Sequence, residues 1–227
     1  STVRNRKHGK GSGMHSDDQI HSQNSDFRLL GNKWGTSQAL GTSGGEVTFS
    51  FAQSNFPNQV HNFDDSITSA SCQTEIEGSF AAWEAAADID FTRVDDGRDV
   101  DVRLGWANLD GSGGTLGVAT TPRTGPLDDV LVRFDPAESW FTGGDAPATQ
   151  IDFSAVARHE IGHAIGLGHS SSGPSLMQPF YSPDVLELRA DDIRGAQTLY
   201  GSPGTGTGVG NDIPSNPATA ATLAVGG

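Results

Sequence analysis

Residues 159–169 have the sequence HEIGHAIGLGH, which contains three of the chain's seven histidines. His159 and His163 are four residues apart, so on a helix their imidazoles lie one above the other and can bind a single metal ion. Gly166 can end that helix in a conformation that other residues resist, which brings His169 back as a third ligand. Three neutral nitrogens leave one tetrahedral position for water, the layout of a catalytic zinc site rather than of a closed structural one.

Glu160 directly follows the first histidine and can point toward the open side of the metal. A zinc ion lowers the pKa of its bound water to about 7 and polarises a carbonyl oxygen. Glu160 would take the proton of that water and pass it to the leaving amine, so the predicted chemistry is hydrolysis of an amide bond. Two alternatives stay open. One is a surface helix with solvated histidines, and the other is a zinc site without catalysis, although loss of Glu160 would be the simplest route to the second.

Hydrophobic periodicity predicts the elements around this motif. The motif helix is expected over residues 152–167, and an earlier helix over residues 64–87 has its apolar side chains on one face. A third helix is expected over residues 190–199, closed by Gly201. Short strands are expected at residues 47–51, 91–94, 100–104, 116–120 and 130–134. This order predicts a mixed α/β sheet with few helices and many glycine-rich loops.

Composition excludes several classes of protein. The chain has 14 Lys and Arg against 28 Asp and Glu, a net charge of −14, so nucleic acid is not an expected partner. No apolar run approaches the roughly 18 residues that span a bilayer, so a membrane is not expected as a partner either. The single cysteine, Cys72, excludes an intrachain disulfide. Its place on the apolar face of a predicted helix indicates a buried free thiol.

Composition also divides the chain into three parts. Residues 1–26 are a polar leader or propeptide remnant, in which Asp17 or Asp18 could block a metal site. Residues 27–201 contain the predicted elements and form the expected catalytic domain. Residues 202–227 are rich in Gly, Pro and Thr and are interpreted as a linker or tail. The sequence leaves open whether the first part inhibits the second.

The extended motif HExxHxxGxxH resembles that of the metzincin zinc peptidases. Ser170 directly after the third histidine resembles the matrixin branch, the matrix metalloproteinase family. Met177 in the stretch SLMQPFY looks like the methionine that lies beneath the zinc, and Tyr181 follows it four residues later, as in matrixins. The stretch FRLLGNKW at residues 27–34 is also similar, so the resemblance covers residues 27–201.

The resemblance implies an α+β fold with a twisted, mostly parallel five-stranded sheet, one antiparallel edge strand, three main helices, and a cleft between an upper and a lower subdomain. It implies a secreted, extracellular, zinc-dependent endopeptidase of bacterial origin that acts on polypeptides as a monomer. One alternative is a catalytically silent or latent module of the same fold that binds peptides or matrix. Another is a zinc hydrolase for non-peptide amides, which an open, strand-lined cleft disfavours.

Substrate binding is expected between two walls. The edge strand should leave backbone groups free, so that an extended peptide can pair with it. The wall opposite is apolar, which predicts a hydrophobic residue just after the cut. The residues expected on these walls are Leu116, Gly117, Val118 and Ala119 on the strand, and Pro179, Phe180 and Tyr181 opposite.

The stretch DGSGGTLGVATT at residues 110–121 resembles the matrixin loop that wraps a calcium ion. The expected ligands are the carboxylates of Asp110, Asp135 and Glu138 and the carbonyls of Gly111, Gly113 and Thr115. Oxygen ligands of this kind suit calcium, and a glycine-rich turn with solvated acids is the alternative. The structural zinc of many matrixins is not expected, because Val118 and Arg133 occupy the matching positions. One zinc ion is therefore predicted, with Arg133 paired to a nearby acid.

Overall fold

The computed structural model describes residues 1–5, 26–144, 146–171 and 173–204 of the 227-residue chain. Asp17 and Asp18 and most of the tail expected at 202–227 lie outside these residues. Within the described part, no helix combines the length and the apolar character that crossing a bilayer requires.

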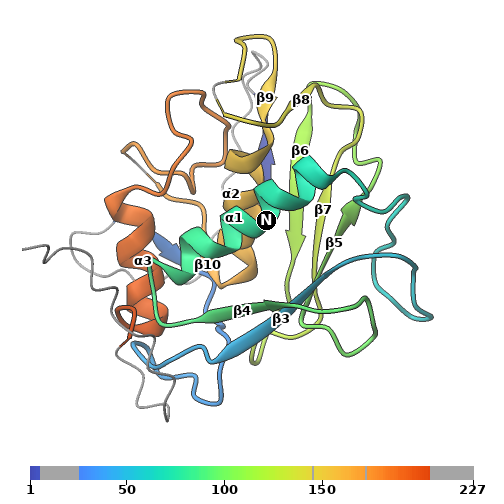
Figure 1. Cartoon of the computed structure of the whole chain (residues 1–227). Coiled ribbons are helices and arrows are strands. Elements are labelled where there is room, and N and C mark those ends of the chain that lie inside the picture. Colours follow the sequence, from blue (N-terminus) through green and yellow to red (C-terminus); the bar gives the residue numbers. More distant parts are fainter. Residues whose placement is uncertain (6–25, 145, 172, 205–227) are drawn as a thin grey trace, which may run out of the picture.

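The largest element is a mixed six-stranded sheet in the order β1-β6-β7-β5-β3-β4 (Figure 1). Its strands are β1 (Thr2–Arg4), β3 (Glu46–Phe51), β4 (Asp90–Arg93), β5 (Val102–Trp106), β6 (Thr115–Thr120) and β7 (Val130–Phe134). Two small pairs add β2 (Arg28–Leu29) with β10 (Leu167–Gly168), and β8 (Trp140–Phe141) with β9 (Ile151–Asp152). Strands β4, β3, β5 and β7 are parallel, and β6 is antiparallel to β7. These five strands confirm the predicted sheet with its single antiparallel strand.

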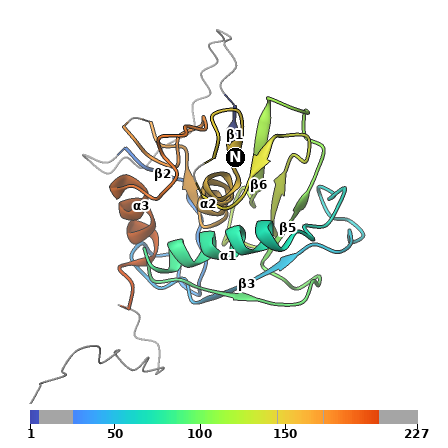
Figure 2. The same cartoon turned by 45° about the horizontal axis from the view of Figure 1, so that its top comes forward.

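The sixth strand, β1, corrects the prediction that β6 is a free edge. β1 is antiparallel to β6 and pairs Thr2 with Val118 and Val3 with Gly117, and Figure 2 shows the two strands side by side. Beyond them, the amide of Ala119 donates to the Ser1 carbonyl at 3.0 Å. An unpaired strand edge is a template for any extended segment, and β-branched residues favour that conformation. Sequence periodicity could not reveal this pairing, because β1 is only three residues long.

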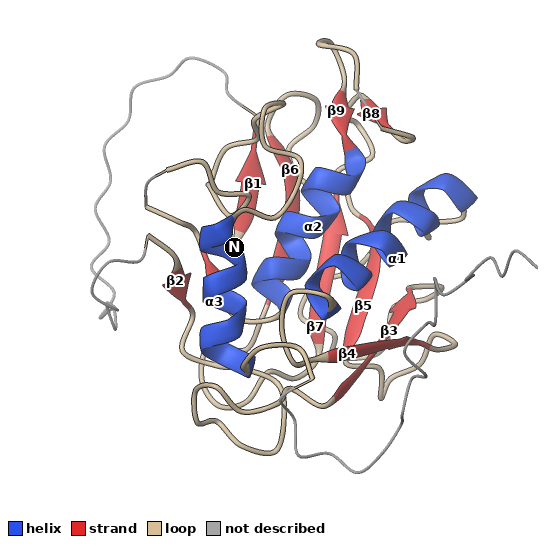
Figure 3. Cartoon of the chain, turned by 60° about the vertical axis from the view of Figure 1, so that its left-hand side comes forward, coloured by secondary structure: helices blue, strands red, loops and turns tan. Residues whose placement is uncertain are grey.

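Helix α1 (Ala70–Glu84) lies with the motif helix on one face of the sheet (Figure 3). It is shorter than the predicted helix over residues 64–87. The Ser69 side chain caps its first turn by accepting the amide of Cys72, and Asp65 forms a bridge with Trp106 instead of a helical turn. The predicted apolar face is confirmed, and its buried residues on α1 are Cys72, Ile76, Phe80 and Trp83. Cys72 is a buried free cysteine, as expected.

The motif helix is α2 (Phe153–Ala164), and almost all of it is buried. Asp152 caps its start, with the side chain accepting the amide of Ala155 at 2.9 Å. It ends before the predicted boundary of residue 167, since Gly166 has a φ of +99°. A Cβ there would meet the carbonyl oxygen of Asn32, so glycine alone allows the chain to turn at this point.

Helix α3 (Ala190–Tyr200) confirms the third predicted helix and helps to hold the end of α2. The hydroxyl of Tyr200 donates to the carbonyl of Ile165 at 2.6 Å and accepts the amide of Trp34 at 3.1 Å. The indole of Trp34 in turn donates to the carbonyl of Ala164 at 2.9 Å. These bonds satisfy carbonyls that the end of a helix would otherwise leave without partners. The turn that carries the histidine motif is therefore fixed from two sides.

Candidate active site

The structure brings together the three predicted histidines. His159 and His163 lie on α2, His169 follows β10, and the ring centroids are 4.7 to 5.4 Å apart. One ring nitrogen from each histidine lies within 4.8 Å of the other two. All three Nε2 atoms are buried and have no hydrogen-bond partner among the described residues. Three buried, unpaired nitrogens that converge in this way fit the ligand set of a zinc ion.

The opposite nitrogens of two rings are held by backbone carbonyls. Nδ1 of His159 lies 2.7 Å from the Leu176 carbonyl, and Nδ1 of His163 lies 2.7 Å from the Leu167 carbonyl. Donation from Nδ1 leaves Nε2 without a proton, which is the state that binds a metal. Burial is the main cause that lowers the pKa of His159 to about 3 and that of His169 to about 4. The rings are therefore neutral at neutral pH.

Glu160 lies at the side of the triad with one oxygen unused. Its Oε2 is buried and has no hydrogen-bond partner in the part of the chain that the structure describes, and its Oε1 accepts the Val3 amide at 3.0 Å. Burial raises the pKa of Glu160 to about 8, against opposing effects of the terminal ammonium and of the amides of Val3 and Ala119. A carboxyl with such a pKa can exchange a proton near neutral pH. Gly117 allows the close approach of β6, because a Cβ there would lie 2.8 Å from Cγ of Glu160.

Met177 lies buried in a turn against α2, close to Gly162. The turn is held by Asp192 in the first turn of α3. The Asp192 carboxylate accepts the amide of Leu176 at 2.9 Å and that of Met177 at 3.1 Å, together with the hydroxyl of Ser175. Because the Leu176 carbonyl faces His159, Asp192 acts through this turn on the orientation of a predicted ligand.

Sequence reasoning missed this role of Asp192. The neighbouring acid, Asp191, accepts the amide of Asp26 at 3.2 Å and the hydroxyl of Ser170 at 3.1 Å. An acid in the first turn of a helix is an ordinary feature of a helix N-terminus. Asp192 therefore gave no indication in the sequence that it also holds the turn around Met177. The donors lie in the stretch that begins at Ser175, and only the tertiary fold brings them to the Asp192 carboxylate.

The predicted calcium loop has its three acids turned toward backbone amides. Oδ2 of Asp135 accepts the amides of Leu109, Asp110 and Gly111 at 2.9 to 3.1 Å. Burial acts to raise the pKa of Asp135, but its four backbone hydrogen bonds outweigh this and lower it. Glu138 accepts the amides of Gly113 and Gly114, and Asp110 accepts the amide and hydroxyl of Thr115. The acids thus come from two segments, before β6 and after β7, that meet through these bonds, while calcium itself stays a prediction.

Val118 on β6 and Arg133 on β7, the residues at the positions that match the structural zinc of matrixins, lie opposite each other on neighbouring strands. The expected ion pair of Arg133 is wrong for the described acids, because none of them forms one with it. Its guanidinium instead lies 3.5 Å from the hydroxyl of Thr120. Burial lowers the pKa of Arg133, and Asp64 opposes this at longer range.

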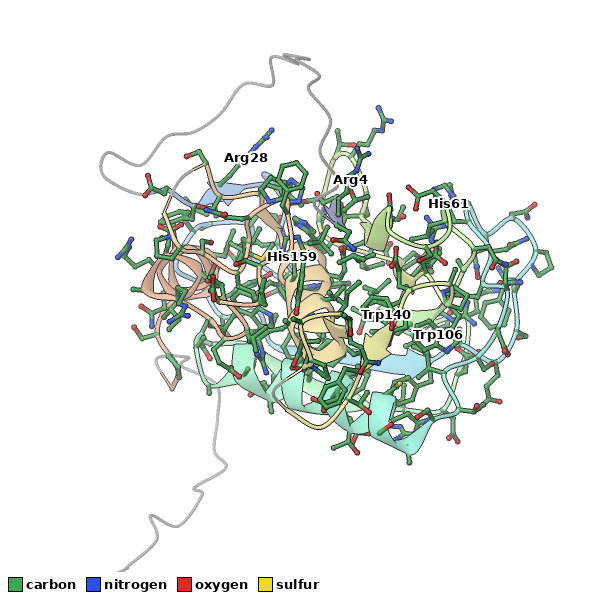
Figure 4. All side chains as sticks on the ribbon, turned by 90° about the horizontal axis from the view of Figure 1, so that it is seen from above. Arg4, Arg28, His61, Trp106, Trp140 and His159 are labelled. Atoms are coloured by element: carbon green, nitrogen blue, oxygen red, sulfur yellow. The ribbon has the colours of Figure 1, made fainter. Side chains whose placement is uncertain are left out.

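The segment at residues 1–5 lies between the two predicted walls. On the side opposite β6, the amide of Arg4 donates to the Pro179 carbonyl at 3.2 Å, and its carbonyl accepts the Tyr181 amide at 3.0 Å. In Figure 4 the label Arg4 marks the position of β1, and the label His159 marks the position of α2. The side chain of Val3 is 2% exposed and reaches a pocket beside His159. The other lining residues include Val156, Leu176, Phe180, Tyr181 and Val185.

Comparison with known proteins gives one family. A sequence model of that family, described as Matrixin, matches residues 50–201. The chain is 33% identical over 150 residues to Metalloendoproteinase 1-MMP of Arabidopsis thaliana, a match covering 60% of this chain and 40% of the relative. It is 32% identical over 154 residues to human Matrix metalloproteinase-20, covering 63% and 30%. It is 38% identical over 137 residues to rat Matrilysin, covering 56% and 49%.

In each of these three relatives the match spans less than half of the relative's own length. The family model, by contrast, covers more than half of this chain and contains both the histidine motif and Met177. The mixed sheet and three helices agree with the fold that the sequence predicted. The chain belongs to the matrixin family.

Proposed function

We propose that this chain is a secreted zinc-dependent endopeptidase. The observation that carries the proposal is the set of four buried atoms without partners, Nε2 of His159, His163 and His169 and Oε2 of Glu160. A buried polar atom without a partner is costly, so such atoms indicate a missing ligand. The matrixin relatives support a metallopeptidase at the level of the family, and their names describe metalloproteinases. The proposal that the protein is secreted rests on the same relationship.

The proposed mechanism assigns a separate task to each group. Zinc, when bound by the three histidines, would supply an acidified water and a polarised substrate carbonyl. Glu160 accepts a proton from the attacking water and delivers it to the nitrogen of the leaving amine. The peptide is held in extended form by β6 on one side and by Pro179 and Tyr181 on the other, which positions the reacting bond. Asp192, through its turn, keeps His159 in place.

The catalytically silent binding module is the weaker alternative. A module that only held peptide would have no use for a buried carboxyl beside the histidines, and burial of an unpaired carboxyl oxygen disfavours folding. Glu160 is such a group. A latent enzyme is compatible with the same residues, because latency concerns what occupies the cleft and leaves the chemistry intact.

Cleavage of a quenched fluorogenic peptide library tests the proposed activity and its specificity. We expect cuts before apolar residues to be at least about tenfold faster than cuts before charged ones, because the pocket beside His159 is apolar and desolvating a charge there is unfavourable. The zinc-loaded chain and a Val3→Asp variant, which frees this pocket, should be assayed together. A preference for charged residues would refute the assigned pocket, and no cleavage by either protein with zinc bound would refute the activity.

We also propose that the loop at residues 110–115 binds calcium and so stabilises the domain. A ligand present at 100 times its Kd adds about 2.7 kcal/mol to the free energy of unfolding, which raises Tm by roughly 5–10 °C in a chain of this size. Thermal unfolding with and without millimolar calcium measures this shift. Glu138→Gln should reduce it, since the variant removes one of the three carboxylates. Equal Tm values for the chain with and without calcium would contradict calcium binding.

A further inference from the structure

Residues 1–5 lie in the cleft as a peptide substrate would. The chain thus places one of its own peptide bonds at the candidate active site. β1 pairs antiparallel with β6 and forms a parallel bridge with Phe180 on the opposite wall. Beyond β1, the amide of Asn5 donates to the Gly114 carbonyl at 2.9 Å. The segment therefore forms backbone bonds to β6 and Gly114 along its length, and to the opposite wall at Arg4. Such bonds do not depend on the identity of the side chains, so they fix the direction and register of any bound peptide.

The register places one particular peptide bond at the reactive groups. The amide of Val3 donates to Oε1 of Glu160 at 3.0 Å, and the buried Val3 lines the pocket beside His159. The backbone of Thr2, on the other side of the same bond, interacts with the ring of His169. The nitrogen of the Thr2–Val3 bond thus faces the group that would protonate a leaving amine, and its carbonyl side faces the histidines.

We infer that the chain hydrolyses its own Thr2–Val3 peptide bond. The inference rests on the proposed function and names an internal substrate for the same site. One water is consumed: the bond between the Thr2 carbonyl carbon and the Val3 nitrogen breaks, and Thr2 gains the water oxygen as a carboxylate. Both water protons end on the Val3 nitrogen, the first of them through Glu160, so that Val3 becomes a free N-terminal ammonium group. No oxidant, reductant or other reactant is needed.

The reaction is expected to occur within one molecule. β1 belongs to the same chain as the cleft and is connected to it through residue 26, where the described sequence resumes. A tethered segment meets its site at an effective concentration of about millimolar, well above that of a separate molecule in a dilute solution. The rate of this cleavage should therefore be independent of protein concentration.

Substitutions of Val3 test whether this residue holds the segment in the cleft. A carboxylate at this position would have to be buried in an apolar pocket, so Val3→Asp should release the segment, whereas Val3→Ile should keep it. Val60 is 81% exposed and offers a matched control, because Val60→Asp adds the same charge outside this pocket. None of these substitutions removes a histidine or Glu160.

Binding of the segment can be measured without metal or activity. The amide of Tyr181 donates to the Arg4 carbonyl, so its hydrogen exchange, monitored by NMR on a sample freed of metal, reports whether the segment is bound in the cleft. We expect exchange at Tyr181 to be at least about tenfold faster in Val3→Asp, and unchanged in Val3→Ile and Val60→Asp. Exchange at Tyr181 that is equally fast in all four proteins would overturn the proposed seating.

Cleavage is followed by intact mass after zinc is added to the full metal-free chain. We expect loss of one Ser and one Thr residue from the chain, from Val3→Ile and from Val60→Asp, and none from Val3→Asp. Each sample also receives a fluorogenic peptide. Hydrolysis of that peptide while the Thr2–Val3 bond stays intact would overturn the inference and leave the proposed function standing. Failure to cut either one, with zinc bound, would overturn both.

Discussion

Replacing Glu160 with Gln is expected to lower kcat for peptide hydrolysis by roughly 10²–10⁴-fold, the usual contribution of a general base. The glutamine side chain would occupy the same volume but cannot accept the proton of an attacking water. The three Nε2 atoms that are assigned to zinc belong to other residues, so the zinc content of Glu160→Gln should equal that of the parent. Steady-state kinetics on one peptide, with metal analysis of the same samples, measures both quantities.

Glu77→Gln is a matched control for this experiment. Glu77 lies on α1, and its ion pair with Arg93 is exposed, with 42% and 48% of the two side chains accessible. Loss of this charge should leave kcat and zinc content unchanged. If Glu160→Gln retained activity within about tenfold of the parent at equal zinc content, Glu160 would not be the base.

The largest effect on stability is expected at Asp96, far along the chain from the histidine motif. Its carboxylate binds the guanidinium of Arg103 through two bonds, Nε to Oδ1 at 2.7 Å and Nη2 to Oδ2 at 2.8 Å. Both side chains are almost fully buried, and Arg103 also lies over the ring of Phe56 at 4.2 Å. Asp96→Ala would leave a buried cation without its partner. We expect the free energy of unfolding to fall by about 3–5 kcal/mol, measured by urea unfolding at neutral pH.

The same pair gives a pH dependence with a definite sign. Burial acts to raise the pKa of Asp96, but hydrogen bonds from Arg103, Gln53 and Ser50 outweigh it and lower the pKa. A carboxyl whose pKa is lower in the folded state stabilises the fold above its unfolded pKa of about 3.9 and loses that effect as the pH falls through its folded pKa. The difference in stability between the parent and Asp96→Ala should therefore be constant above about pH 5 and shrink below about pH 4.

The exposed pair at Glu77 again supplies the comparison. Its geometry is similar, with 2.7 Å between Arg93 Nη1 and Glu77 Oε1, but solvent screens it. Glu77→Gln should change the free energy of unfolding by at most about 1 kcal/mol. Equal losses in Glu77→Gln and Asp96→Ala would show that burial of the Arg103 pair is not what determines its contribution.

Features set by local sequence were predictable. The spacing of His159 and His163 depends only on helix geometry, and Gly166 marks the turn that returns His169. The apolar face of α1 follows from side chains that recur every three or four residues. Boundaries were less accurate, because the start of α1 depends on the capping side chain of Ser69 and on tertiary contacts just before it.

Features that depend on distant partners were not predictable. Asp192 holds the turn around Met177 only because α3 packs beside it, and no local pattern indicates this. The pairing of β1 with β6 joins residues more than a hundred positions apart, and a polar leader gave no reason to expect a strand in the cleft. The sequence suggested Asp110, Asp135 and Glu138 as calcium ligands, but whether Asp135 faces an ion or backbone amides depends on the folded loop.

Measuring activity as a function of bound zinc tests most directly whether the three histidines form a single catalytic zinc site. The chain should be freed of metal with a chelator, titrated with zinc, and assayed at each step on a peptide with an apolar residue after the cut. We expect no activity without metal and full activity at one zinc ion per chain, since the described residues contain one cluster of three such ligands, His159, His163 and His169. Peptide hydrolysis by the metal-free chain, or activity that requires a second zinc ion, would contradict this prediction.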